Sequence, residues 1–307
     1  DAAGPSEVKR ISYASLIARR FFRQRSAVVG LTILGILVLL AIFGPLICKY
    51  NYTDPDFTAI NVAPNARHWF GTDGGGFDLF ACVVHGLGRS LVIGLTYAIL
   101  TTAISAIVGT AIAYARGWGE KIGMWLLDML LVIPSFLLVA MIVRAASGTQ
   151  GWLMLILGLT AFGWIGYART LRTMALSLRE RDYVRAAKYM GVPSIKIIIR
   201  HLIPNLGSIL VIDTVLGVGI KAPDTSLGYI LSQGSSAMLS APWIVLIPSV
   251  VLIILCVSMQ LIGDGLRDAF DPYSRAAGEV ADEESKKDEA EKTAAAAAGT
   301  AAGSHHE

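Results

Sequence analysis

The chain has 307 residues, of which 54% are hydrophobic and only 16% are charged, and its mean hydropathy is +0.59. These values exclude an ordinary soluble domain and predict an integral membrane protein. The net charge of +3 does not indicate a nucleic-acid partner, because the basic residues lie at the ends of apolar runs rather than on one polar face. The three cysteines lack paired spacing, which argues against a zinc or C-x-x-C redox motif.

The first 26 residues are basic and predict an amphipathic arm on the cytoplasmic side of the membrane. Residues 27–48 follow as an apolar run that is long enough to cross a hydrocarbon core of about 30 Å. The run is too long for the apolar region of a cleavable signal peptide. We therefore expect a first membrane span here, entered from the cytoplasm.

Residues 49–88 are polar and, by alternation, predict an outer loop. Two glycine-rich strings stand in and beside it: residues 71–78, Gly-Thr-Asp-Gly-Gly-Gly-Phe-Asp, and residues 85–91, His-Gly-Leu-Gly-Arg-Ser-Leu. Glycine permits tight turns. A phosphate-binding loop would need a preceding strand and a following Gly-Lys-Ser/Thr, neither of which the sequence indicates. Cys48 and Cys82 are both expected outside the membrane, and the sequence leaves open whether they pair.

Residues 91–114, 122–143 and 152–167 predict the second, third and fourth spans. Pro134 lies inside the third and is expected to kink it. Basic residues outnumber acidic ones in the stretch 172–205 that follows. The positive-inside rule therefore places this stretch in the cytoplasm, together with the N-terminal arm.

Two short amphipathic helices are predicted within residues 172–205. In the first, apolar and small side chains recur at helical spacing: Tyr183, Ala186, Ala187 and Met190. In the second, the same spacing is repeated by Ile195, Ile198, Ile199 and Leu202. Gly191 suits a helix C-cap, Pro193 suits a new helix start, and Pro204 is expected to end the second helix. Such a segment either enters a groove on a soluble partner or lies on the membrane against anionic lipid.

The fifth predicted span is unusually short, because only residues 206–220 are apolar and Asp213 interrupts them. Either the protein has a deletion here, or a piece is missing from the printed sequence. Residues 225–241 are expected to form another outer loop and residues 242–262 a sixth span. Residues 276–307 predict a disordered tail, in which Gly-Ser-His-His at residues 303–306 resembles the remnant of an expression tag.

Candidate chemistry is sparse in this sequence. No Gly-x-x-x-x-Gly-Lys-Ser/Thr string occurs, so the chain is not expected to bind or hydrolyse ATP. Asp128 and Asp213 lie within predicted spans and are functional candidates by position, although Asp128 could simply bond a neighbouring helix. The histidines form no i, i+4 pair for a metal and no arrangement with a nucleophile. We expect neither an enzyme nor a metal-binding protein.

Three strings resemble a known family. Ala186-Ala187, Gly191 and Pro204 follow the order of the EAA loop of ABC importer permeases, with Arg185 where a glutamate is usual. Residues 71–78 resemble the Gly-Thr-Asp-x-x-Gly-Arg-Asp element of C-type permease subunits from oligopeptide and dipeptide importers, with phenylalanine replacing the arginine. Residues 263–272, Gly-Asp-Gly-Leu-Arg-Asp-Ala-Phe-Asp-Pro, are similar to the C-terminal string of the same subunits.

The resemblance implies an all-α polytopic membrane protein with the type I ABC importer permease fold. Its six spans would lie within residues 27–275, and both termini would be cytoplasmic. It further implies a bacterial plasma-membrane location, a second homologous permease subunit, ATP-binding subunits that hold ATP and Mg, and an extracytoplasmic binding protein. Oligopeptides or dipeptides would be the cargo, although related permeases also serve nickel chelates and haem.

In that family the EAA loop occupies a cleft of the ATP-hydrolysing subunit and couples its cycle to alternating access. The residues implied in this contact are Tyr183, Arg185, Ala186, Ala187, Lys188, Met190, Gly191 and Pro204. Their motion is expected to pass through Pro204 into the fifth span. The alternative is a secondary transporter or channel that works alone, which two isolated carboxylates do not favour.

Overall fold

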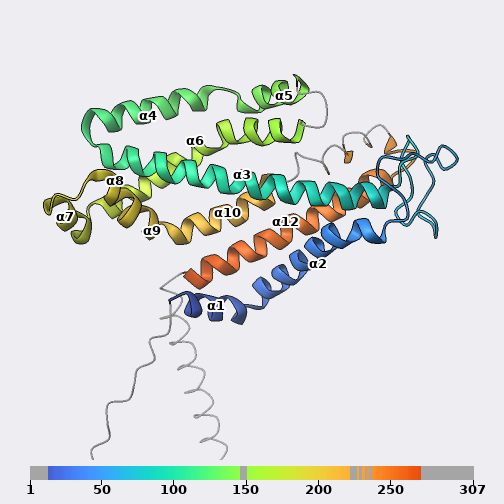
Figure 1. Ribbon diagram of the computed structural model, residues 1–307, viewed down its shortest axis with the longest axis horizontal. Helices are drawn as coiled ribbons and strands as arrows, with labels where there is room; N and C mark the ends of the chain where they lie inside the picture. Colours follow the sequence, from blue (N-terminus) through green and yellow to red (C-terminus); the bar gives the residue numbers. More distant parts are fainter. Residues whose placement is uncertain are drawn as a thin grey trace, which may run out of the picture.

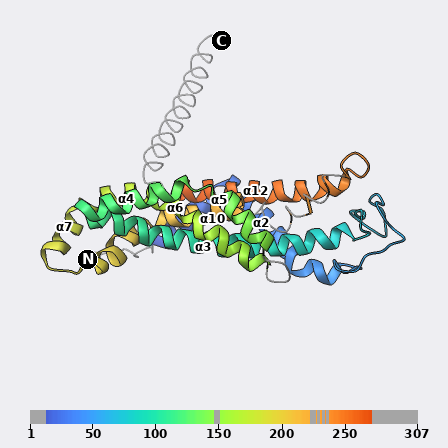
Figure 2. The same ribbon diagram turned by 90° about the horizontal axis from the view of Figure 1, so that it is seen from above.

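The protein is a bundle of helices drawn out along one axis (Figures 1 and 2). The computed structural model describes residues 13–145, 151–221, 227, 230–231, 234 and 237–270. The long helices are α2 (Arg25–Ile47), α3 (Leu79–Ala115), α6 (Gly151–Arg179) and α12 (Trp243–Phe270). The shorter ones include α1 (Tyr13–Arg23), α4 (Gly117–Val132), α5 (Ser135–Ala145), α7 (Asp182–Tyr189) and α10 (Gly207–Lys221). Figure 1 places residues 180–206, the basic segment, at one end of the bundle and residues 48–78, the capping loop, at the other.

Four of the described helices are long and apolar enough to cross a membrane, namely α2, α3, α6 and α12. A fifth crossing is counted if residues 194–205 and 207–217, which are bent by 66° to each other, form one span. The third predicted span, residues 122–143, is split at Pro134 into α4 and α5. Proline lacks the N–H of a helical bond, and Ile133 before it takes the extended backbone that proline favours. The six-span topology therefore stays a prediction.

Helix α3 is the centre of the bundle and packs against α2, α6 and α10. Its 37 residues rise about 55 Å, well beyond a hydrocarbon core of about 30 Å. Helix α3 begins at Leu79, so residues 79–88 of the predicted outer loop 49–88 are helical, and the helix starts twelve residues before the predicted second span. Where α3 meets α6 the two backbones run close together, and the Ser105 hydroxyl donates to the carbonyl of Trp164 at 2.9 Å.

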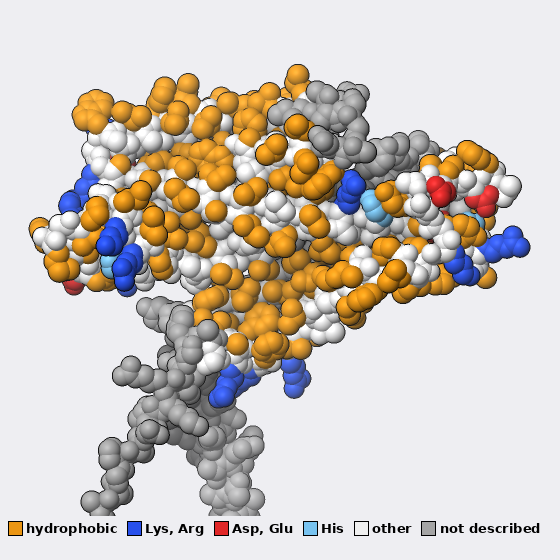
Figure 3. Space-filling view, viewed as in Figure 1, with side chains coloured by type: hydrophobic (Ala, Val, Ile, Leu, Met, Phe, Trp, Pro, Cys, Tyr) orange, Lys and Arg blue, Asp and Glu red, His pale blue; other side chains and the backbone are white. Residues whose placement is uncertain are grey.

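The main hydrophobic core lies among α2, α3 and α12. Its buried side chains are Leu37, Leu79, Val83, Leu87, Ala98, Leu227, Leu255 and Met259. The C-terminal string that begins at residue 263 takes part in similar packing nearby, where a Cβ added to Gly265 would overlap Ala27 and one added to Gly263 would overlap Leu216. These glycines therefore let α12 approach α2 and α10 closely. Figure 3 shows the resulting hydrophobic surface across the middle of the molecule, with Lys and Arg gathered toward its ends.

Other boundaries also differ from the sequence-based expectation. The fourth span, predicted at residues 152–167, continues as α6 to Arg179, so residues 172–179 of the predicted loop 172–205 are helical. The sixth span, predicted at residues 242–262, continues as α12 to Phe270. The tail at residues 276–307 and residues 1–12 of the arm lie outside the described residues, as do eight of the seventeen residues of the loop predicted at 225–241.

Candidate functional site

The basic segment is a chain of short helical pieces. After α7 come α8 (Ser194–Ile197), the π-helical turn η1 (Ile198–Leu202) and α9 (Ile203–Asn205). The prediction that Pro204 ends the helix is wrong, because the helical backbone continues to Asn205. Proline at this position offers no N–H to the turn before it, and the wider π turn relieves the crowding of its ring. The axis then bends by 66° into α10.

Helix α7 ends in a Schellman motif. The N–H of Gly191 donates to the carbonyl of Lys188 at 3.0 Å, and the N–H of Val192 donates to the carbonyl of Ala187 at 3.2 Å. Gly191 has a φ of +76°, which confirms the C-cap predicted from the sequence. A Cβ added there would meet nothing within 4 Å, so glycine is required for its backbone conformation and not for space.

Helix α7 presents two different faces. Val184 and Ala187 are buried, in a core that joins the basic segment to α3 and α6. The other members of that core are Ala106, Ala113, Leu171, Ala175, Ile197, Leu202 and Leu206. The opposite face is exposed and is here called the open face; it consists of Tyr183, Ala186, Tyr189 and Met190. Tyr189 and Met190 are 81% and 76% exposed, so most of this face is open, while Tyr183 at its edge is 39% exposed and lies beside the ring of His201.

The predicted grouping of α7 side chains is therefore divided by the structure. The sequence predicts Ala187 on one stripe with Tyr183, Ala186 and Met190. The structure instead buries Ala187 in the core that it shares with α3 and α6. Helical spacing identifies residues that share a face, whereas the position of neighbouring helices decides which edge of that face is covered.

The second predicted stripe also changes register. Ile195 and Ile199 are 69% and 62% exposed, whereas Ile197, which lies outside the stripe, is fully buried with Leu202. The π turn adds a residue to the local repeat, so an α-helical period does not hold across it. Two large apolar side chains are thereby added to the exposed surface of the basic segment.

Five basic side chains surround these exposed apolar groups. All five are exposed and none forms an ion pair within the described part of the chain: Arg181, Arg185, Lys188, Lys196 and Arg200. The surface therefore combines apolar contact area with an excess of positive charge, because the exposed Asp182 offsets only one of the five basic groups. A partner that matched it would offer an apolar groove with acidic residues at the rim.

An ionic cluster connects the start of the basic segment to α3 and α4. Glu120 of α4 pairs with Arg172 and, at 3.9 Å, with Arg179, both from α6. Arg179 also donates to the carbonyl of Ala113 at the end of α3. The Glu120 side chain is only 21% exposed, so water screens this cluster less than a surface pair.

A second acidic residue extends the cluster into the segment itself. Glu180 accepts from Arg179 at 3.1 Å and from Arg116 at 3.2 Å. Sequence reasoning missed Glu120 and its partners. The available signal was Glu120 itself, an acidic residue near the cytoplasmic end of a predicted span. Its arginine partners lie more than fifty residues further along the chain, so no local sequence pattern identifies them.

The two intramembrane candidates, Asp128 and Asp213, are not brought together. Asp128 on α4 accepts from Arg169 of α6 at 2.9 Å, and each side chain is about half exposed. Asp213 lies on α10 and is partly buried. No hydrogen bond joins the two carboxylates among the described residues, so the structure offers no relay between them there.

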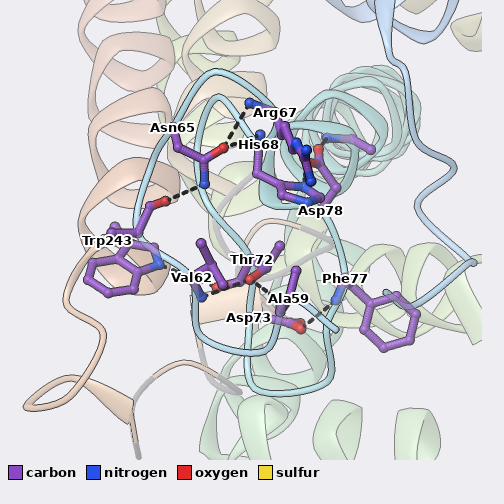
Figure 4. Close-up of polar contacts among 12 residues, drawn as sticks. Ala59, Val62, Asn65, Arg67, His68, Thr72, Asp73, Phe77, Asp78 and Trp243 are labelled. Atoms are coloured by element: carbon purple, nitrogen blue, oxygen red, sulfur yellow. Dashed lines mark hydrogen bonds and ion pairs between the residues drawn. The ribbon is translucent and has the colours of Figure 1, made fainter. Parts of the chain in front are cut away.

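The capping loop closes on itself through polar contacts (Figure 4). His68 and Asp78 are both buried, and His68 Nδ1 lies 2.8 Å from Asp78 Oδ2. The other Asp78 oxygen accepts from the N–H of Ala81 at 2.9 Å and so caps the start of α3. Trp243 of α12 donates from its indole nitrogen to the carbonyl of Thr72 at 3.3 Å. The loop is thus fixed to two long helices.

The glycine-rich string in this loop is occupied by its own backbone. Asp73 Oδ1 accepts from the N–H groups of Gly75 and Phe77, both at 2.9 Å. The N–H of Gly76 donates to the carbonyl of Asp73 at 3.1 Å. With these donors already engaged, the string is a folded turn and not a phosphate cradle.

Groups that could hold a metal are missing from the described residues, where no three His, Cys, Asp or Glu side chains cluster. Cys48 and Cys82 are both free thiols. Burial raises the pKa of the Cys48 thiol, with a further contribution from the nearby carboxylate of Asp78. A raised pKa disfavours the reactive thiolate.

Comparisons with known proteins agree with this architecture. Residues 102–275 match the family described as binding-protein-dependent transport system inner membrane component, and residues 12–64 match the N-terminal TM domain of oligopeptide transport permease C. The oligopeptide transport system permease protein OppC of Mycobacterium tuberculosis is 40% identical over 280 residues, covering 86% of this chain and 96% of the relative. The Bacillus subtilis protein of the same name is 33% identical over 294 residues, covering 89% of this chain and 96% of the relative.

A third relative, a putative peptide transport system permease protein of Brucella suis, is 38% identical over 281 residues and covers 86% of this chain and 93% of the relative. Both the family match and these identities extend over most of the helical bundle. The chain therefore belongs to the bacterial inner-membrane permease components of binding-protein-dependent ABC transporters, among the OppC-like oligopeptide permeases.

Proposed function

We propose that this chain is one of two permease subunits of an oligopeptide importer, with six spans and both termini in the cytoplasm. A second homologous permease completes the translocation path, and an extracytoplasmic binding protein delivers the peptide. Separate subunits bind ATP and Mg and supply the energy. The names of the relatives support the peptide cargo, and the basic character of residues 180–206 supports the orientation.

The observation that carries the coupling role is the open face of α7. Tyr183, Ala186, Tyr189 and Met190 form an apolar surface that the described chain leaves largely uncovered, and the same segment carries exposed basic side chains. A small residue, Ala186, in its centre permits close approach of a partner backbone. An ATP-binding subunit with an apolar cleft and an acidic rim fits both properties.

The buried face of α7 provides the path by which its motion reaches the membrane. Val184 and Ala187 pack into the same core as Leu171 of α6 and Ala106 of α3. Because a packed core transmits displacement rather than absorbing it, a push on the open face would move the ends of α3 and α6 together. This path adds to the one through Pro204 and α10, and the Glu120 cluster connects α6 to α4 beside it.

The test replaces Ala186 with tryptophan in the assembled transporter. Ala186→Trp should prevent close docking and lower substrate-stimulated ATPase activity by about tenfold or more, while the melting temperature of the permease stays unchanged. Ala186→Ser keeps the small size and is the matched control. If Ala186→Trp transports at the wild-type rate, α7 does not dock in a tight cleft.

This design avoids Ala187, although the sequence favoured it equally. Ala187 is 3% exposed, so a large substitution there would disturb the chain's own core and would not report on docking.

The subunit composition and cargo need separate measurements. Purification of the tagged chain from its native host should recover an ATP-binding subunit and a second permease. If the chain transports peptide alone in liposomes along an ion gradient, it is a secondary transporter. The cognate binding protein should hold a peptide, and a nickel chelate or haem in its place would overturn the peptide assignment.

A further inference from the structure

A groove opens between three helices near the capping-loop end of the bundle. Its volume is about 260 Å³, and α2, α3 and α6 all contribute to its lining. Ala41 and Pro45 come from α2, and Trp152 comes from the first turn of α6. Neither the coupling path nor the peptide assignment uses this feature.

Helix α3 contributes one continuous stripe to the groove. His85, Gly88, Arg89 and Val92 line it together, and their spacing of i, i+3, i+4 and i+7 places them on one helical face. Gly88 has no side chain to fill the groove, and a Cβ added there would reach only ordinary van der Waals contact with Ala41. The glycine-rich string at residues 85–91 thus has a structural result that its sequence did not reveal: an arginine and a histidine above an apolar floor.

The groove lies at the level of a membrane interface. From Arg89 to Ala115 the helix rises about 39 Å at 1.5 Å per residue, which exceeds a hydrocarbon core of about 30 Å. On α2, Pro45 lies about 30 Å from Arg25 by the same measure. Trp152 stands beside Arg89, and tryptophan is enriched where hydrocarbon meets headgroups. A hydrocarbon core of about 30 Å thus fits between Ala115 and Arg89, which is compatible with headgroup depth for Arg89 and places Val92 about one turn closer to the hydrocarbon.

The two polar side chains of the groove are held in place, and the one charged group among them, Arg89, has no acidic ion-pair partner in the described part of the chain. The guanidinium of Arg89 lies 5.8 Å from the centre of the Trp152 ring, within cation–π range. His85 is stacked on Tyr52 with ring centres 3.7 Å apart. No carboxylate forms an ion pair with Arg89 in the described ranges, although its side chain is exposed. The exposed guanidinium of Arg89 is therefore accessible to an anionic group.

We propose that this groove binds an anionic phospholipid from the leaflet on the capping-loop side, with its headgroup phosphate on Arg89 and His85. Arginine presents several N–H donors in a planar fork that matches phosphate oxygens. The acyl chain lies along Val92 and Ala41, an apolar floor that a peptide with its polar main chain would not match. Val92 is 55% exposed, which leaves room for that chain.

The first experiment measures lipid retention by native mass spectrometry on the transporter purified as its natural complex. Phosphatidylglycerol and phosphatidylcholine with identical acyl chains are titrated separately. Wild type should prefer phosphatidylglycerol, and Arg89→Gln should weaken that binding by about tenfold. Arg67→Gln, which removes an exposed charge from the capping loop outside the groove, is the matched control and should keep the preference. Equal retention in Arg89→Gln and wild type would overturn the proposal.

The second experiment identifies what occupies the apolar floor. Val92→p-benzoyl-phenylalanine is irradiated in membranes, and the mass of the adduct is measured. A phospholipid adduct supports the proposal. A cross-link to another permease subunit or to transported peptide would overturn it. Glycerol phosphate, which lacks acyl chains, should not displace the lipid at equal concentration; if it does, the site recognises free phosphate instead.

Discussion

The capping loop and the basic segment lie at opposite ends of the same bundle and are stabilised in opposite ways. In the capping loop, polar groups are turned inward, and the buried contact of His68 with Asp78 fixes the loop to α3. In the basic segment, the inward side is apolar, and polar and apolar groups alike are left open on the outward side. The polar groups of the capping loop bond to one another, whereas the basic segment exposes charged and apolar side chains to a partner.

This difference separates structural motifs from interaction surfaces. Both ends carry a string that resembles a family motif, and the strings alone do not distinguish the two roles. In the string at residues 71–78, the Asp73 carboxylate accepts from the string's own amides, and the Asp78 carboxylate caps α3 and contacts His68. In α7, Val184 and Ala187 are the residues buried against the chain's own helices. The open face is therefore available to another protein.

The largest effect should come from breaking the capping loop at its polar centre. Asp78→Ala removes the α3 cap and leaves His68 buried without its partner, which should cost about 2–4 kcal/mol locally. Hydrogen exchange of residues 50–77 should accelerate accordingly. Asp54→Ala, at an exposed carboxylate that accepts only from neighbouring Thr53, is the control. Equal exchange in the two variants would contradict the buried-centre interpretation.

The next effect concerns the ionic cluster above the basic segment. Glu120→Gln removes the charge that Arg172 and Arg179 share, and should lower stability by about 1–3 kcal/mol. It should also lower the ratio of stimulated to basal ATPase activity, because the path from α7 to α4 is loosened. Glu180→Gln, whose side chain is 55% exposed, should cost only about 0–1 kcal/mol. Comparable losses in both variants would show that burial does not decide the role of Glu120.

A smaller effect is expected at the end of α7. Gly191→Ala forces a positive φ on a residue with a Cβ and should cost about 1 kcal/mol, with a drop of a few fold in stimulated ATPase activity. Gly207→Ala is the matched control, because its Cβ also meets nothing within 4 Å and it carries no positive φ. Thermal unfolding and ATPase assays measure both. A larger loss in the control would mean that the bend into α10, and not the turn after α7, limits coupling.

The smallest effect is expected at Phe77, where the resemblance suggested an arginine. The Phe77 side chain is partly exposed, and the bond that fixes this position comes from its main-chain N–H. Phe77→Arg should therefore change stability by less than about 0.5 kcal/mol. Asp73→Ala removes the acceptor of two N–H groups and should cost about 1–2 kcal/mol. A larger loss of stability in Phe77→Arg than in Asp73→Ala would show that the Phe77 ring, and not the backbone turn, stabilises the loop.

Local sequence determined the features that depend on short-range chemistry. The apolar runs at α2, α3, α6 and α12 identified membrane helices, since burying uninterrupted apolar length in a bilayer needs no information about neighbours. Gly191 identified the end of α7, because a left-handed backbone position selects glycine on its own. Helix ends without a glycine or proline signal were predicted less accurately. Helix α3 begins at Leu79 and not at residue 91, because its first turns include His85 and Arg89 and do not resemble an apolar span.

Only the tertiary structure decided which of several similar side chains is buried, which is exposed and which forms an ion pair. Ala186 and Ala187 are adjacent and identical in type, and only the position of α3 and α6 buries one and exposes the other. Glu120 finds Arg172, and Arg89 finds Trp152, across more than fifty residues of chain. Helical periodicity orders residues around one axis, whereas contacts between helices depend on how several axes pack, and that information is spread over the whole chain.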